Sequence, residues 1–208
     1  MTVSVARSLR LAAAALGGYA CGLFPTADLV ARRHGVDLRE AGTGNPGAAN
    51  AAGQLGATAG LEVMAGDIAK AVVAGRVGCV AAGDLGVHVG ATAAVIGHCH
   101  PVTHPGRGGK GVAASVGQVL VSFPVYFPID AAVAVATAAL PVWRQRAFAA
   151  TVAASTVWVG ASTLWWRRGW NNAWGPEPSA ALPIAAAVSS AVIAERFVAA
   201  ERAGRTAG

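Results

Sequence analysis

Three long stretches of this 208-residue chain contain no Asp, Glu, Lys or Arg. They cover residues 111–129, 147–166 and 178–194, and are 19, 20 and 17 residues long. A helix needs roughly 20 consecutive apolar residues to cross the hydrocarbon core of a bilayer. Because lipid offers no partner to backbone N–H and C=O groups, spans of this length are expected to be helical. The stretches therefore predict an all-α membrane protein.

The composition supports this prediction. Only 12% of the residues are charged, 54% are hydrophobic, and the mean hydropathy is +0.50. A soluble domain typically has about 25% charged residues. The alternative, a soluble alanine-rich bundle, would lack the charge to cover its surface. The net charge of +6 could indicate nucleic acid binding in a soluble protein. Here the basic residues lie mostly between apolar stretches, which favours contact with anionic membrane lipid and no nucleic acid partner.

The apolar segments predict about seven transmembrane helices in one polytopic domain that spans residues 1–208. The first segment resembles a signal peptide because Arg7 and Arg10 precede it, but no small-residue cleavage site is convincing. We therefore interpret it as the first membrane helix. A tight turn is expected at residues 128–130. The expected helices lie at residues 9–31, 55–75, 85–97, 111–127, 131–143, 147–166 and 180–199.

Seven spans place two glycine-rich polar loops, residues 32–54 and 98–110, on the same side of the membrane. The connections and tail on that side hold ten Lys or Arg residues, against five on the opposite side. The positive-inside rule then predicts a multi-pass cell-membrane protein with both loops in the cytoplasm and the N-terminus outside. Arg7 and Arg10 alone favour the opposite orientation.

The first glycine-rich loop contains the run GTGNPGAAN at residues 42–50. Its three glycines allow the backbone to approach a ligand closely and expose amide N–H groups. Thr43, Asn45 and Asn50 add neutral hydrogen-bonding side chains. The alternative is an ordinary turn and helix cap between two helices.

The second loop contains GHCHPV at residues 97–102 and GRGGKGVA at residues 106–113. A glycine-rich loop that leads into a helix suits phosphate, because the helix N-terminus offers free N–H groups and a favourable dipole. Lys110 adds a positive charge. The run is not a Walker A loop, since Gly111 stands where Ser or Thr would hold magnesium.

Histidines beside this loop raise the question of zinc. His98, Cys99, His100 and His104 lie too close in sequence to converge well on one ion, and there is no second group of ligands. We therefore expect no metal site. His98 is instead a candidate for hydrogen bonding or proton transfer, or an interfacial cap.

Asp67 and Lys70 are charged residues within a predicted span. Their spacing of three places them on one helix face, where they can pair. Charges inside a membrane usually face a protein interior or a water-filled cavity. One interpretation is a pathway pair in a small transporter, but the chain shows no repeated halves of the kind common in transporters.

Together these motifs resemble the bacterial membrane glycerol-3-phosphate acyltransferases that use acyl-phosphate. Members of that family carry a GSGNxGAtN-type first motif and a GHxxPvf…GGKGvAt-type second motif. This chain has GTGNPGAAN at residues 42–50, GHCHPV at 97–102 and GGKGVAAS at 108–115. Residues 67–70 resemble the DxxK of the intervening helix. The order, spacing and helix number agree over nearly the whole chain.

The resemblance implies transfer of a fatty acyl group from acyl-phosphate to the primary hydroxyl of sn-glycerol 3-phosphate, giving lysophosphatidate for phospholipid synthesis. No cofactor or metal is implied, because acyl-phosphate is already activated and proximity supplies much of the rate. Backbone amides would stabilise the oxyanion. The implied catalytic residues are Thr43, His98 and Lys110. The implied substrate-binding residues are Gly42, Gly44, Asn45, Gly47, Asn50, Asp67, Lys70, Gly108, Gly109, Gly111 and Arg196.

The chain also departs from the family pattern. Thr43 replaces the usual Ser and keeps its hydroxyl, but Gly53 stands where the family usually has Arg. A third motif of the form HRxNIxRL would fall at residues 195–202, where only Arg196 is retained. These departures leave an alternative open, an inactive or weakly active relative that binds phospholipid precursors or partner enzymes. The sequence makes no prediction of oligomeric state.

Overall fold

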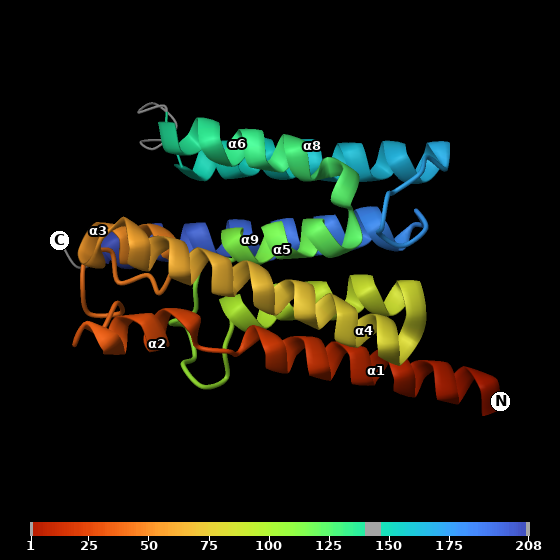
Figure 1. Ribbon diagram of the computed structural model, residues 1–208, viewed down its shortest axis with the longest axis horizontal. Coiled ribbons are helices and arrows are strands. Elements are labelled where there is room, and N and C mark those ends of the chain that lie inside the picture. Colours follow the sequence, from red (N-terminus) through yellow and green to blue (C-terminus); the bar gives the residue numbers. More distant parts are fainter. Residues whose placement is uncertain (1, 140–146, 207–208) are drawn as a thin grey trace.

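Every element in the described part of the computed structural model, residues 2–139 and 147–206, is helical. The long helices lie side by side, and the N-terminus and C-terminus lie at opposite ends of the bundle (Figure 1). This confirms the predicted all-α class. The elements are α1 (Thr2–Gly22), α2 (Thr26–Arg33), α3 (Ala48–Leu55), α4 (Ala57–Cys99), α5 (Val112–Ser122), the 3₁₀ turn η1 (Pro124–Tyr126), α6 (Phe127–Ala139), α8 (Ala147–Arg168) and α9 (Ala181–Thr206).

The prediction of one continuous helix over residues 9–31 is wrong. The structure divides it into α1 and α2, and residues 23–25 lie between them. Pro25 causes the break, because proline has no N–H to donate and disfavours helical geometry at the residue before it. After this break the chain continues through α2 into the first glycine-rich loop, at the end of the bundle where the polar loops lie. Similarly, the first predicted loop contains the short helix α3, which the sequence prediction missed.

Helix α4 is a hairpin of two arms. Its backbone leaves helical geometry at Ala82 and at Gly83, whose φ of 63° suits glycine, so the predicted break near residues 83–84 is confirmed. The arms pack with their backbones in contact. A Cβ atom at Gly78 would lie 1.9 Å from the Gly86 carbonyl oxygen, and one at Gly90 would lie 2.4 Å from the carbonyl oxygen of Ala74. Small residues permit this approach, as is common between membrane helices.

Helix α1 packs on the second arm of α4 and runs in the same direction. A Cβ at Gly18 would meet Gly90, and one at Gly22 would meet Ala94, so the contact advances equally along both helices. The chain therefore leaves both helices at the same end of the bundle. The two glycine-rich loops lie there together (Figure 1).

The connection between α5 and α6 also differs from expectation. The predicted turn at residues 128–130 is helical, and the chain instead turns at residues 123–126. Pro124 ends α5, while Pro128 fits the first turn of α6, where a backbone N–H is not needed. Helix α8 falls close to its predicted position, whereas α9 begins as predicted but continues to Thr206, seven residues beyond its predicted end. The predicted end of the 131–143 helix, together with Arg144 and Arg146, lies outside the described residues.

Four segments of the described residues are long and apolar enough to cross a membrane, the first of them formed by α1 and α2 together: Ser4–Arg33, Ala57–Cys99, Phe148–Arg168 and Ala181–Arg202. Helix α5 is a shorter apolar helix. Buried Gln118 of α5 links its neighbours, since its Nε2 donates to Thr92 Oγ1 at 3.1 Å and its Oε1 accepts from Ser189 Oγ at 2.6 Å. Pairing of this kind meets the demand for internal hydrogen bonds in lipid. The number of seven spans stays a prediction.

Candidate functional site

A cleft opens at the polar end of the bundle, between the α1–α2 connection, the first arm of α4 and the two glycine-rich loops. Five of the residues proposed from sequence line it, namely Asp67, Lys70, His98, Gly108 and Gly109. The first motif contributes Pro46. Thr26, Asp28, Arg39 and His104 line the cleft as well, although the sequence did not single them out for this site.

Lys70 is the centre of the buried floor of the cleft. Its ammonium nitrogen lies 2.8 Å from Asp67 Oδ1, 2.8 Å from His98 Nδ1 and 3.3 Å from the Phe24 carbonyl oxygen. An ammonium has three protons, so these three acceptors use all of them. Only 8% of Lys70 and 2% of Asp67 is exposed, which leaves solvent little part in balancing the charges. Lys70 therefore joins the α1–α2 connection to both arms of α4.

The same buried pair contacts one ring nitrogen of His98. Nδ1 lies 2.8 Å from the Lys70 ammonium and 3.5 Å from Asp67 Oδ1, so it accepts from Lys70 or donates to Asp67 according to the tautomer. The Nε2 side of the ring faces the second loop, where a Cβ at Gly109 would lie 2.1 Å from Nε2. The Gly109 N–H in turn donates to the His98 carbonyl oxygen at 3.1 Å. The loop thus folds directly onto the imidazole.

Asn50 organises the first loop from inside. Its buried amide Nδ2 donates to the carbonyl oxygens of Leu38 and Ala41, both at 3.0 Å. Its Oδ1 accepts from the Thr43 backbone N–H at 2.9 Å. Gly42 packs against it, because a Cβ there would lie 2.3 Å from Oδ1. These contacts shape the loop itself. Among the described lining residues of the cleft, none is a predicted residue of the first motif (Gly42, Thr43, Gly44, Asn45, Gly47 and Asn50).

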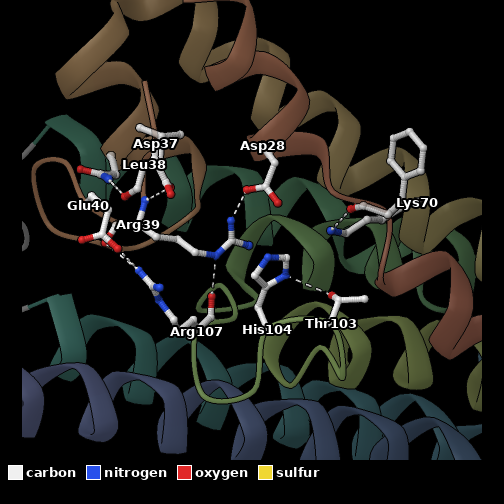
Figure 2. A network of polar contacts seen from close by, with 11 residues as sticks. Asp28, Asp37, Leu38, Arg39, Glu40, Lys70, Thr103, His104 and Arg107 are labelled. Atoms are coloured by element: carbon white, nitrogen blue, oxygen red, sulfur yellow. Dashed lines mark hydrogen bonds and ion pairs between the residues drawn. The ribbon is translucent and has the colours of Figure 1, made fainter. Parts of the chain in front are cut away.

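Two arginines connect the loops at the mouth of the cleft (Figure 2). The Arg39 guanidinium pairs with Asp28 of α2, and its Nε donates to the Arg107 carbonyl oxygen at 3.2 Å. Arg107 pairs with Glu40 of the first loop. Arg39 and Asp28 have side chains only 11% and 15% exposed. Sequence reasoning missed this network because no regular spacing relates its members.

Thr26 was missed for the same reason. Its Oγ1 is buried and has no hydrogen-bond partner among the described residues. It lies in the wall of the cleft, where a ligand could supply the missing partner.

Three consecutive residues of α9 contact the other side of the second loop. Glu195 Oε2 lies 3.1 Å from His100 Nε2. Arg196 donates through Nη2 to the carbonyl oxygens of Gly108 at 2.8 Å and Gly106 at 3.1 Å, and through Nε to that of Gly109 at 3.4 Å. The third residue is Phe197, whose ring centroid lies 4.6 Å from the Lys110 ammonium. Lys110, Gly111 and Arg196 thus lie on the α9 side of the loop, and no described lining residue of the cleft is one of these three.

The Lys110 side chain, which contacts the Phe197 ring, is half-buried. Its burial lowers the pKa of the ammonium below the usual lysine value, and nearby Glu201 partly opposes the change. Gly111, whose φ is +84°, follows it and begins the turn into α5. The Lys110 charge therefore lies two residues before the first residue of the apolar helix α5.

We expect Arg196→Gln to loosen the second loop, because three carbonyl oxygens lose a charged donor. Hydrogen exchange of the Gly109 amide should accelerate at least about tenfold, since hydrogen bonds to charged groups contribute roughly 1.5–3 kcal/mol. Arg167→Gln, which removes an arginine far from the loop, is the control. Equal exchange at Gly109 in both variants would contradict this role.

A bundle of apolar helices with a polar cleft at one end is the architecture of a multi-pass membrane protein. The sequence model of the family described as glycerol-3-phosphate acyltransferase matches residues 12–200, so the chain belongs to this family. The resemblance noted from the motifs is thereby confirmed.

Curated relatives and solved structures agree with this assignment. The chain is 42% identical over 111 residues to a glycerol-3-phosphate acyltransferase of Exiguobacterium sibiricum, a match that covers 53% of this chain and 54% of the relative. It is 35% identical over 136 residues to one of Symbiobacterium thermophilum, covering 65% and 66%. The chain thus spans about half to two thirds of the length of the curated relatives it matches.

Two crystal structures of PlsY, an integral membrane glycerol 3-phosphate acyltransferase, are similar over almost the whole fold. The glycerol 3-phosphate form has a TM-score of 0.70 and 26% identity, covering 93% of this chain and 90% of that one. The lysophosphatidic acid form has a TM-score of 0.65 and 25% identity, covering 93% and 89%.

Proposed function

We propose that this chain transfers a fatty acyl group from acyl-phosphate to the primary hydroxyl of sn-glycerol 3-phosphate, giving lysophosphatidate. The observation that carries the proposal is the cleft, in which both glycine-rich loops meet beside hydrogen-bonded His98, whose side chain is only 8% exposed. The similar PlsY structures are described as glycerol 3-phosphate and lysophosphatidic acid forms. These two molecules differ by one acyl group, as acceptor and product of this reaction do.

Lys110 is proposed to bind the phosphate group. Its ammonium contacts an aromatic ring, and a phosphate offers it stronger, charge-assisted hydrogen bonds. The backbone amide of Gly108 and the N-terminal end of α5 add favourable donors. Thr43 and Asn45 are proposed to orient the glycerol part through their polar side chains.

His98 is proposed to act as a hydrogen-bond donor through Nε2. In the tautomer in which Nδ1 accepts from Lys70, Nε2 carries the hydrogen, and Nε2 is the nitrogen that faces the second loop. A donated hydrogen bond stabilises the negative charge that develops on the acyl oxygen during attack. Asp67 and Lys70 then act by positioning His98, which changes the substrate-binding role that the sequence suggested for them.

The two loops are proposed to face the cytoplasm. The excess of basic residues at this end supports that orientation. Glycerol 3-phosphate is charged and does not cross a bilayer unaided, so its site is expected on the side where the cell holds it.

The direct test uses the full chain purified in lipid with acyl-phosphate and glycerol 3-phosphate. We expect lysophosphatidate to form, and Lys110→Ala to lower the rate at least about 100-fold, as removal of one charge-stabilising donor commonly does. Arg32→Ala removes an exposed cation beyond the lining of the cleft and should leave the rate near that of the unmodified protein. Turnover no higher than in a lipid-only blank would refute the proposal.

A further inference from the structure

A second groove lies at the opposite end of the bundle from the cleft. It runs between the N-terminal part of α1 and the tip of the α4 hairpin, and has a volume of about 790 Å³. Arg7 and Arg10 of α1 form its charged part. Leu11, Val80 and Leu85 form apolar parts of the wall. The proposed reaction uses none of these residues.

The two arginines are uncompensated. Their spacing of three places them on one face of α1, and neither has an ion pair or hydrogen bond from its side chain within residues 2–139 and 147–206. No carboxylate lines the groove in the described part of the chain. Asp84, at the hairpin tip, accepts from the Glu177 backbone N–H at 3.0 Å and so faces a different segment. Arg39, Arg107 and Arg196, by contrast, each have an ion pair or a hydrogen-bond partner within the protein.

The groove is also amphiphilic. Val80 is 91% exposed, although it is a large aliphatic residue. Two guanidinium groups therefore lie beside an uncovered apolar surface, in a chain whose first membrane segment begins at Ser4. A ligand with a negative group and a hydrocarbon chain would satisfy both parts, whereas a soluble anion would leave the apolar wall uncovered.

We propose that this groove binds an anionic phospholipid of the leaflet opposite the cleft. The headgroup phosphate would lie on Arg7 and Arg10, since guanidinium groups form paired hydrogen bonds with phosphate oxygens. One acyl chain would pack against Val80 and Leu85. The inference does not depend on the proposed reaction.

Native mass spectrometry of the delipidated full chain, titrated with phosphatidylglycerol, tests the proposal. Because the two guanidinium groups supply the attraction to the headgroup, Arg7→Gln/Arg10→Gln should weaken binding at least about tenfold. The matched control is Arg167→Gln/Arg168→Gln, which removes the same charge from the end of α8, at the same end of the bundle as the N-terminus (Figure 1). The control should retain binding within about twofold.

Four results would overturn the proposal. Equal loss in both double variants would indicate only a general charge effect, and no loss in either would show that the groove is not the site. Equal binding of phosphatidylcholine, or displacement of the lipid by inorganic phosphate, would exclude an anionic lipid as the specific ligand. Because neither arginine belongs to the proposed catalytic machinery, the acylation rate and the thermal unfolding midpoint in detergent verify that each variant is folded.

Discussion

Lys70→Met is expected to destabilise the folded protein by about 3–5 kcal/mol, the usual effect of removing one partner from a buried ion pair. The substitution leaves the Asp67 carboxylate 2% exposed without its nearest cation. It also removes the ammonium that contacts His98 Nδ1 and donates to the Phe24 carbonyl oxygen. The free energy of unfolding in mixed detergent measures the effect, and acylation should be lost with it.

The double variant Asp67→Asn/Lys70→Met makes this prediction specific. It removes both charges, so its free energy of unfolding should recover at least half of what Lys70→Met loses. Acylation should stay low even where stability recovers, because His98 still lacks its positioning donor. If the double variant is as unstable as the sum of its two single substitutions, the proposed coupling between Asp67 and Lys70 is absent.

The second large loss of stability is expected from a substitution in the α4 hairpin. Gly78→Ala places a Cβ 1.9 Å from the Gly86 carbonyl oxygen, so the two arms must separate. Overpacking of this kind costs about 1–3 kcal/mol, and a clash with rigid backbone belongs at the upper end of that range. The change also moves Lys70 relative to His98, because the two residues lie on opposite arms.

Gly160→Ala in α8 is the matched control. It introduces the same methyl group into a helix, with no atom within 4 Å of the new Cβ. Its unfolding free energy should stay the same or rise by up to about 1 kcal/mol, since alanine favours helices over glycine. A similar loss of stability in both variants would mean that the hairpin contact is not the cause.

Proline positions explain most of the differences between predicted and observed helices. Pro25 and Pro124 both interrupt apolar runs that average hydropathy treats as continuous. Hydropathy measures how well a segment tolerates lipid, whereas helix continuity depends on each backbone N–H. The break at Gly83 was predicted because polar Asp84 interrupts the hydropathy at the same place.

The site was predicted in part, and the division follows sequence distance. The Asp67–Lys70 pair follows from a spacing of three on one helix. The contact of Lys70 with His98, which is 28 residues away, depends on the reversal of α4. The positions of Arg39 and Thr26 in the cleft depend on how α2 and the two loops pack together. No local periodicity encodes such contacts.

The sequence by itself determined that this is an all-helical membrane protein of the acyltransferase family, because long uncharged runs and two glycine motifs are local properties of the chain. Only the tertiary structure decided that Lys70 uses its three protons on protein acceptors, and that Arg196 holds the second loop. It alone also left Arg7 and Arg10 unpaired in a groove of the described bundle. The physical reason is that ion pairing and burial depend on which helices pack against each other. The local sequence of one helix does not specify its packing partners.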